Sequence, residues 1–496
     1  MMGICGTAMT ALAGCLRSLG MRVTGSDAHP YPPMSDHLRK LGIEPFEGYR
    51  AENIPADADL VVVGNVITEA NPEAAEMRRR GLPYLSMAAA VKRFAIAGRH
   101  AIVVAGTHGK TTTTSLAAHA LVELGAEPGF LIGGIAQNFG TNFRMGGDSS
   151  GGGSGLFVIE GDEYDTAYFD KTPKFFKYEP RTLIFTSLEF DHADIYADLD
   201  AIRTQFAGLL RSMPNQGRVI ACTDDPNVRG LLSEASCEVV GYGFGAEAQW
   251  RLTSWEPAGE GGVFELREGG RKNTWRIPMP GRYNALNAAA VIALLAFGLE
   301  NTAGLEHASG TGYPPAEIQR ALDGFKGVRR RQEVRGVADG VTVVDDFAHH
   351  PTAVRLTVEA MRGRYPGRRL WAVFEPRSFT ARGGRFQHEF TEALAGADRV
   401  VCARPFTAEY SAGIVPPDVD SIVPLDVDAI ASELRRRGLA AVAMEDTDAI
   451  LAHLNSEARP GDVVLIMSNG GFDDIHNRLL AALHQRTGAP GAPETP

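Results

Sequence analysis

Short apolar runs alternate with helix-like segments over the first hundred residues of the chain. Residues 21–25 (MRVTG) and 60–64 (LVVVG) predict short buried strands of a parallel sheet. Residues 33–41, which lie between them, predict a helix. This order of elements is typical of a small doubly wound α/β unit.

The same alternation continues in two further stretches. In the second stretch, a predicted strand at residues 101–106 leads into a helix that is expected to end near Leu124. The remaining predicted elements of this stretch are strands at 156–159 and 182–186, short strands with turns over 218–280, and a helix at 284–299. The third begins near Arg329 and has predicted strands at 340–344, 370–374, 399–402 and 463–467. The pattern therefore predicts an α/β fold in three parts.

A chain of 496 residues is too long for one core, and its length agrees with about three domains. We expect domain limits at 1–98, 99–328 and 329–485. Residues 145–155 are rich in glycine and serine and predict a flexible surface loop, and the Pro/Gly-rich residues 486–496 predict a disordered tail.

Charge and cysteine content exclude several classes of protein. The net charge of −11 disfavours a nucleic-acid binder, which needs a basic surface to track phosphates. The five cysteines form no CxxC pair, which argues against a disulfide framework or a zinc site. The longest apolar run, residues 288–299, is too short to cross a bilayer, so we expect a reduced cytoplasmic location without membrane insertion.

The N-terminal turn Gly3-x-x-Gly6-x-x-Met9 has the form of a nucleotide-binding turn, but only two residues precede it. Such turns normally follow a strand. We therefore hypothesise that the start codon was placed too late and that a first strand is missing.

The strongest chemical motif lies between the strand at 101–106 and the following helix, and it reads Gly106-Thr107-His108-Gly109-Lys110-Thr111-Thr112. Backbone amides at such a turn, together with the helix dipole, bind phosphate, while the lysine neutralises the β- and γ-phosphates and the first threonine hydroxyl binds Mg²⁺. The motif is a shortened P-loop, because Val104 stands where a strict Walker A sequence has glycine. A glycine-rich turn with a chance lysine is the alternative.

Two further strands end in potential Mg²⁺ ligands. The strand at 156–159 leads into the acidic run Glu160-Gly161-Asp162-Glu163-Tyr164-Asp165, in which Glu160 is nearest the strand end. His192 follows the strand at 182–186. Ligands collect at this edge of open α/β sheets, so Thr111, Glu160 and His192 are candidate metal ligands. A solvated acidic loop and a structural histidine are the alternatives.

Polar residues also stand at the start of a helix and at the expected junction with the third part. Asn284 and Asn287 lie three residues apart and would present two amides on one helical face, although a helix cap explains that spacing better. The triplet Arg329-Arg330-Arg331 could clamp a triphosphate on domain closure or form a solvated patch. Asp346 ends the first strand of the third part.

These residues together resemble the Mur ligase family over nearly the whole chain. The matching motifs are GxxGxxM, GTHGKTTT, EGDEYD, EFDHADIY, GxxNxxNAxAA, RRR before Glu333, and DDFAHHPT. The resemblance implies an N-terminal Rossmann-like UDP-binding domain, a central P-loop-type ATPase domain, and a C-terminal Rossmann-like domain that closes over ATP. It implies an ATP-dependent ligase that forms an amide through an acyl-phosphate, with two Mg²⁺ ions.

The resemblance also implies roles for the residues that match the motifs. The catalytic set would be Lys110, Glu160, His192, Arg331 and Asp346, and ATP would contact residues 106–112 with Asn284, Asn287, Arg331 and Asp346. The UDP moiety would lie against Gly3, Gly6, Thr7 and Asp27.

Two members of the family share UDP-N-acetylmuramate as a substrate. One joins it to L-alanine, and the other to the murein tripeptide L-Ala-γ-D-Glu-meso-diaminopimelate during peptidoglycan recycling. The chain resembles the second in GICGTAM, DEYDTAYFDK, FEPRS and MSNGGFDDIH, and L-alanine addition is the alternative. Arg377 and Arg382 are plausible cations for the carboxylates of the peptide, with ordinary surface charge as the alternative.

Two positions depart from family patterns. Tyr283 stands where the alanine ligase has histidine, which puts in doubt any side-chain role at 283. More distant Mur ligases carry a carbamylated lysine at a position that falls near Phe206, yet no lysine lies between Lys177 and Lys272. The second Mg²⁺ would then depend on Glu160, His192 and ligand oxygens.

Functions of other classes fit less well. An NAD-dependent oxidoreductase would explain the glycine turn and Asp27, but the turn is not GxGxxG and such an enzyme does not need GTHGKTTT. A non-catalytic nucleotide-binding protein is expected to lose Lys110, Glu160 or His192, and all three are present.

Overall fold

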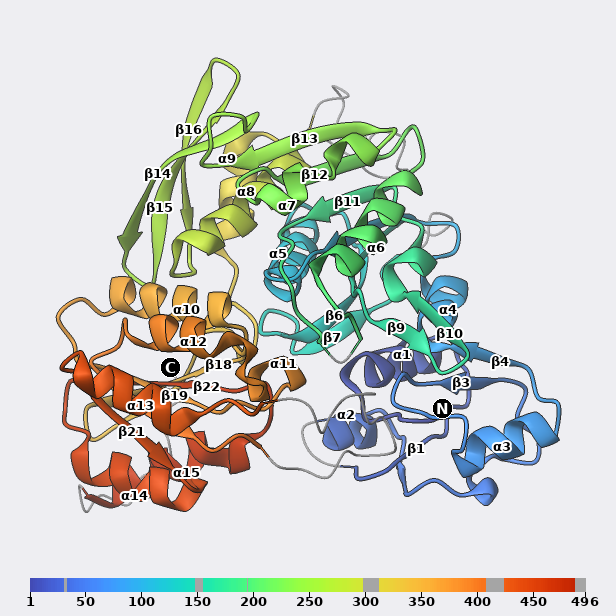
Figure 1. The fold of residues 1–496 in the computed structure, drawn as a ribbon. Coiled ribbons are helices and arrows are strands. Elements are labelled where there is room, and N and C mark those ends of the chain that lie inside the picture. The colour runs from blue at the N-terminus through green and yellow to red at the C-terminus, as the bar shows by residue number, and fades with distance from the viewer. Residues whose placement is uncertain (31–33, 148–154, 194, 298–311, 407–422, 487–496) are drawn as a thin grey trace.

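The computed structural model describes residues 1–30, 34–147, 155–193, 195–297, 312–406 and 423–486. The predicted loop at 145–155, the predicted tail, and the outer ends of the helices predicted at 33–41 and 284–299 fall largely or partly outside these residues. The chain forms three α/β units, as predicted: Figure 1 shows the N-terminal unit in blue and the C-terminal unit in orange to red, with the central unit above and between them.

The N-terminal unit is a small parallel sheet with helices. Its elements are α1 (Thr7–Ser18), β1 (Ser26–Asp27), α2 (Met34–Lys40), β2 (Phe46–Glu47), β3 (Val61–Val63), α3 (Pro72–Arg79), β4 (Tyr84–Ser86) and α4 (Met87–Val91). Strand β1 pairs with β2 and β3 with β4, and Met2 links the two pairs through single parallel bridges to Ser26 and Val63.

The prediction of a strand at residues 21–25 is wrong. These residues have no strand geometry, and pairing begins only at Ser26. The Met1 amine donates to the Thr24 carbonyl, Ser26 N–H donates to the Met1 carbonyl, and Phe46 N–H donates to the Gly25 carbonyl. These backbone bonds are isolated and do not form a continuous ladder along residues 21–25.

The central unit is built on a ten-stranded sheet with the order β16-β15-β14-β13-β12-β11-β5-β8-β6-β7. Its strands are β5 (His100–Ala105), β6 (Gly129–Ala136), β7 (Thr141–Arg144), β8 (Leu156–Gly161), β11 (Thr182–Phe185), β12 (Arg218–Cys222), β13 (Glu238–Gly243), β14 (Trp250–Ala258), β15 (Gly261–Glu268) and β16 (Arg271–Ile277), and a separate hairpin contains β9 (Asp165–Ala167) and β10 (Asp170–Pro173). The helices are α5 (Lys110–Glu123), α6 (Leu199–Arg211), α7 (Pro226–Arg229), α8 (Arg282–Phe297) and α9 (Pro315–Asp323). The last three strands are antiparallel and have seven to nine residues, longer than the short strands predicted there.

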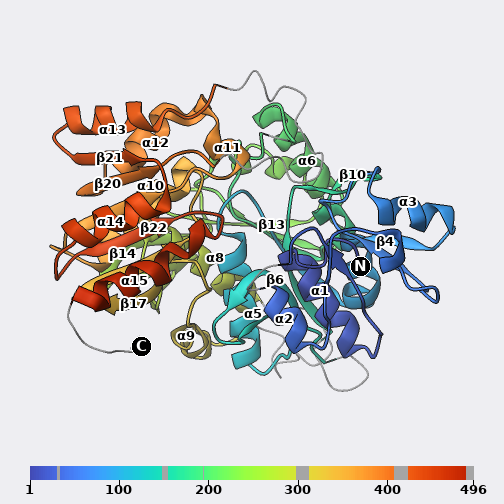
Figure 2. The same cartoon turned by 90° about the horizontal axis from the view of Figure 1, so that it is seen from below.

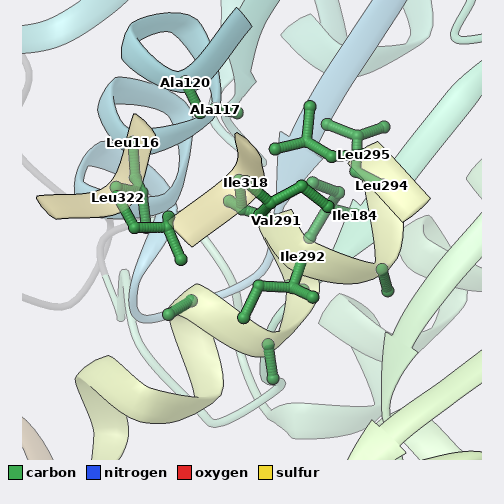
Figure 3. Close-up of a cluster of buried hydrophobic side chains, with 14 of the residues drawn as sticks. Leu116, Ala117, Ala120, Ile184, Val291, Ile292, Leu294, Leu295, Ile318 and Leu322 are labelled. Carbon is green, nitrogen blue, oxygen red and sulfur yellow. The ribbon is translucent and has the colours of Figure 1, made fainter. Parts of the chain in front are cut away.

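Helices α5, α8 and α9 cover one face of this sheet and enclose its main core. Figure 3 shows the apolar side chains that meet there, which include Leu116, Ile184, Val291, Ile292, Ile318 and Leu322. Burying each leucine or isoleucine contributes about 1.5–3 kcal/mol. Helix α8 is apolar on nearly all sides and almost wholly buried, which holds its N-terminus rigidly beside the P-loop.

The opposite face of the central sheet is covered by α6 and by two helices of the N-terminal unit, α1 and α4. Seen from below, α1 lies beside β6 (Figure 2). Phe143 packs directly on Gly14 of α1, where an added Cβ would lie 2.0 Å from its ring. The close approach requires glycine and joins the first two units into one packed body.

The C-terminal unit has a six-stranded sheet with the order β17-β18-β22-β19-β20-β21. Its elements are β17 (Glu333–Ala338), β18 (Val341–Asp346), α10 (Pro351–Arg364), β19 (Leu370–Phe374), α11 (Phe379–Arg382), α12 (Gln387–Leu394), β20 (Arg399–Ala403), α13 (Val427–Arg436), β21 (Ala440–Met444), α14 (Thr447–Glu457), β22 (Val463–Met467) and α15 (Ile475–Arg486). Edge strands β17 and β21 were not predicted. Among the described residues, no helix combines the length and the apolar character that crossing a bilayer requires.

Candidate active site

The P-loop turn follows β5 and is held by the neighbouring strand end. Thr107 N–H donates to the Ser187 carbonyl, and His108 N–H donates to Ser187 Oγ, both over 2.9 Å. Helix α5 then begins at Lys110 without a side-chain cap. Its first amides are therefore free of a capping side chain and point where an anion binds a helix N-terminus.

Gly109 brings this turn against helix α8. It has a φ of +83°, and an added Cβ would lie 2.6 Å from Asn287 Oδ1. Asn287 Nδ2 donates to Asn284 Oδ1 over 3.0 Å, and Asn284 Nδ2 donates to the Pro280 carbonyl over 2.8 Å. The structure thus brings Asn287 to the P-loop. Asn284 accepts the hydrogen bond from Asn287 and donates to the Pro280 carbonyl at the start of α8.

A buried glutamate joins two of the predicted catalytic residues. Glu163 Oε2 accepts from Lys110 Nζ over 3.0 Å, and its Oε1 lies 2.9 Å from His192 Nε2. Burial favours a higher pKa for the Glu163 carboxyl, but Lys110 and His192 outweigh it and lower the pKa to about 2. Glu163 lies in the predicted acidic run but was not singled out there, and it positions both side chains.

Glu160 lies near the end of β8 and contacts Thr111, the residue after Lys110. Its Oε2 accepts from Thr111 Oγ1 over 3.0 Å, and Gly133 N–H donates to its Oε1. Burial, reinforced by Asp162, raises the pKa of Glu160 to about 7. A buried carboxylate beside a hydroxyl is a set of hard oxygen donors that suits Mg²⁺, and a bound cation would offset the cost of the buried charge.

Arg331 reaches the P-loop helix from the junction with the C-terminal unit. Its Nη2 donates to Thr111 Oγ1 over 3.2 Å, and the guanidinium lies 4.9 Å from the centre of the Phe347 ring. The backbone around it is bent, since Arg330 and Gln332 both have positive φ values. This geometry places one positive charge of the arginine triplet at the predicted phosphate site.

Asp346 stabilises that bend. Its Oδ2 accepts from Gln332 N–H and its Oδ1 from Ala348 N–H, both over 2.8 Å. Burial raises the pKa of Asp346 to about 6. The Gln332 side chain continues the network, since its Nε2 donates to the Tyr283 hydroxyl and its Oε1 accepts from Asn284 Nδ2. Gln332 was not predicted, and no local motif marks it.

The four residues predicted for the UDP moiety meet around the first turn. Gly3 has a φ of +73°, Gly6 precedes α1, and Thr7 begins it. Asp27 Oδ2 accepts from Cys5 N–H over 2.8 Å, which holds the turn against β1. Glu73 was missed: this buried carboxylate accepts from Ser26 Oγ and Asn53 Nδ2 beneath the same sheet edge.

Arg377 and Arg382 both contact Phe406. The Arg377 guanidinium stacks 3.7 Å from the centre of the Phe406 ring and lies 3.5 Å from Glu375 Oε1. Arg382 Nη1 donates to the Phe406 carbonyl over 3.1 Å. Glu375 was also missed, although it directly follows β19 and the carboxyl ends of such strands carry functional side chains.

Comparisons with known proteins agree with this arrangement. Three family models match the chain: "Mur ligase family, catalytic domain" over residues 1–99, "Mur ligase middle domain" over 104–295, and "Mur ligase, glutamate ligase domain" over 329–470. The Escherichia coli (strain K12) UDP-N-acetylmuramate–L-alanyl-γ-D-glutamyl-meso-2,6-diaminoheptandioate ligase is 39% identical over 492 residues, which are 98% of each chain.

Solved structures give the same picture. A murein peptide ligase from Psychrobacter arcticus has a TM-score of 0.70 and 34% identity, covering 97% of this chain and 98% of its own. A UDP-N-acetylmuramate-alanine ligase from Thermotoga maritima has a TM-score of 0.76 and 25% identity, covering 98% and 99%. With its three matched domains and a relative 39% identical along nearly the whole chain, this protein belongs to the Mur ligase family.

Proposed function

We propose that this chain uses ATP to join the murein tripeptide L-Ala-γ-D-Glu-meso-diaminopimelate to UDP-N-acetylmuramate. The observation that carries the ligase assignment is Lys110 at the uncapped start of α5, which pairs with the buried Glu163 carboxylate and precedes Thr111, whose hydroxyl donates to Glu160. The choice of tripeptide is supported by the E. coli relative, whose name states that substrate.

The reaction would pass through an acyl-phosphate. The lactyl carboxylate of UDP-N-acetylmuramate attacks the γ-phosphate of ATP and releases ADP. The peptide α-amine then attacks the acyl-phosphate carbonyl, and the amide forms with loss of phosphate and a proton. Lys110 and Arg331 supply positive charge where the transferred phosphoryl group gains negative charge, and the α5 amides hold the phosphates. Glu163 keeps Lys110 charged and aimed at that position.

Mg²⁺ would be held by Thr111, Glu160 and His192, and when bound it would neutralise charge on the phosphates. We propose two ions, as the family resemblance implies. Residues 106–112 would contact the phosphates of ATP, with Asn284, Asn287 and Asp346 contributing to the rest of that site.

The remaining assignments concern the other substrates and the domains. Gly3, Gly6, Thr7 and Asp27 would hold UDP, and Arg377 and Arg382 would bind carboxylates of the peptide.

Domain limits at 1–98, 99–328 and 329–485 agree with the separate sheets of the three units. We place the reaction in the cytoplasm, where ATP is available.

Addition of L-alanine is the second candidate, because the Thermotoga maritima structure of similar fold is an alanine ligase. Both reactions use an alanine α-amine as the attacking group. The two candidate functions therefore differ only in whether the enzyme also gains binding energy from the rest of the tripeptide. The test offers equal concentrations of L-alanine and tripeptide with ATP and UDP-N-acetylmuramate, and identifies the UDP product by mass.

We expect the tripeptide adduct to dominate and Lys110→Ala to form neither product. Lys171→Ala, which removes an exposed lysine, is the matched control and should behave like the wild type. A dominant alanine adduct would overturn the tripeptide assignment, and activity of Lys110→Ala above about a hundredth of wild type would overturn the P-loop assignment.

A further inference from the structure

Three metal-binding side chains converge beside the P-loop, apart from the proposed Mg²⁺ ligands. They are His108 in the P-loop turn, Glu189 after β11, and His350 at the start of α10. His108 Nε2 lies 2.9 Å and His350 Nδ1 lies 3.4 Å from Glu189 Oε2. One ligand atom from each residue lies within 4.8 Å of the other two, and no other such group occurs among the described residues.

Each of the three is held in place by its surroundings. The backbone N–H of His108 donates to Ser187 Oγ, and its carbonyl accepts from Thr186 Oγ1. Glu189 N–H donates to Thr107 Oγ1 over 2.9 Å, which ties its backbone to the same turn. His350 caps α10, and its Nε2 contacts the Phe190 carbonyl over 3.2 Å. A preorganised set of ligands loses little entropy on binding a metal.

The protonation of His350 is fixed by this last contact. A carbonyl only accepts, so Nε2 carries the proton and Nδ1 carries the lone pair. Nδ1 accepts only a long bond from Thr352 N–H, at 3.3 Å, and otherwise faces the Glu189 carboxylate. Two acceptors therefore face each other across 3.4 Å, an arrangement that a cation between them would stabilise.

We propose that His108, Glu189 and His350 form a binding site for a divalent transition-metal ion of the Zn²⁺ type. Two imidazoles and one carboxylate match the ligand preference of Zn²⁺, whereas Mg²⁺ prefers oxygen ligands. Glu189 and His350 also line a cavity of about 420 Å³, which provides an entry path and room for a fourth ligand. The bound ion would tie the P-loop turn to the C-terminal unit.

The test uses the purified full chain, freed of metal and then kept in excess Mg²⁺ to saturate sites with oxygen ligands. Co²⁺ is added as a spectroscopic probe, and the affinity for Zn²⁺ is measured by competition with a chromophoric chelator. Wild type should show visible d–d absorption from one bound Co²⁺, and Zn²⁺ should abolish this absorption and raise the thermal midpoint. Neither readout depends on the ligase reaction, so its outcome is separate from the proposed function.

Glu189→Gln and His350→Gln should each weaken Zn²⁺ binding roughly tenfold or more. The matched control is His349→Gln, which changes the adjacent histidine, whose Nδ1 contacts the Phe347 carbonyl. If His350→Gln disturbs the start of α10, the Zn²⁺ affinity of Glu189→Gln still tests the proposal, because that substitution leaves the backbone contacts of residue 189 in place. Absence of Co²⁺ absorption in wild type, or unchanged affinity in Glu189→Gln, would overturn the proposal.

Discussion

Arg331 Nη2 lies 3.2 Å from Thr111 Oγ1, although 220 residues separate the two in sequence. Thr111 belongs to the first turn of α5, and Arg331 stands at the junction with the C-terminal unit. The contact brings the guanidinium to the hydroxyl that we propose as a Mg²⁺ ligand. The position of the C-terminal unit is thereby coupled to the P-loop.

Replacing this arginine should impair catalysis. Arg331→Ala removes a charge beside the transferred phosphoryl group, and we expect kcat to fall about 100-fold or more, with a smaller change in KM for UDP-N-acetylmuramate. Steady-state kinetics of phosphate release measure both values. Arg329→Ala is the control, since Arg329 belongs to the same triplet but is exposed. Equal loss in the two variants would contradict a specific role for Arg331.

The Mg²⁺ requirement should depend on Glu160 and His192. Glu160→Gln and His192→Ala each remove a proposed ligand, so the Mg²⁺ concentration for half-maximal activity should rise about 10- to 100-fold and kcat should fall. Titration of activity with MgCl₂ measures the change. Glu179→Gln, which alters an exposed carboxylate, should leave the titration unaltered. If either variant has the same Mg²⁺ titration as the wild type, the replaced residue is not a Mg²⁺ ligand and has a structural role.

Activity should be independent of bicarbonate. The position near which distant Mur ligases carry a carbamylated lysine is Phe206, which is buried and stacked on Phe185 with the ring centres 4.8 Å apart. An aromatic core residue cannot form a carbamate or bind a metal. We expect the same kcat in CO₂-depleted buffer with and without added bicarbonate, and rescue by bicarbonate would show that a carbamate exists elsewhere.

His100 should make stability depend on pH. Burial lowers its pKa to about 4, with contributions from Arg181 and Arg218. Because the folded pKa is below that of the unfolded chain, about 6.5, the unfolded state binds the proton first, and stability falls as the pH decreases through this range.

His100→Gln should remove this dependence and retain a partner for the Thr182 hydroxyl. Between about pH 7 and about pH 5, the wild type should lose about 2 kcal/mol more free energy of unfolding than the variant. Urea unfolding at the two pH values measures the difference. His388→Gln is the control, since that side chain is largely exposed. If the wild type and His100→Gln lose the same free energy of unfolding between the two pH values, His100 is not the source of the pH dependence.

The fold could be predicted where one segment determines its own structure. Strands β19 and β22 coincide with the predicted ranges, because five consecutive apolar residues can be buried on both faces of a parallel sheet. Edge strand β21 (AAVAM) was missed because alanine and methionine favour helices, and only pairing with β20 makes the segment a strand. At residues 21–25 the pattern predicted a strand, but the neighbouring backbone makes only isolated hydrogen bonds with this segment.

The sequence by itself determined the α/β pattern, the P-loop turn and the presence of a helix directly after it, because these depend on residues close together in the chain. Only the tertiary structure decided that Glu163 pairs with Lys110 and His192, and that His350 meets His108 and Glu189. Such contacts join strand ends and helix starts from separate segments. Their distances depend on sheet order and on how the units pack, which no local pattern encodes.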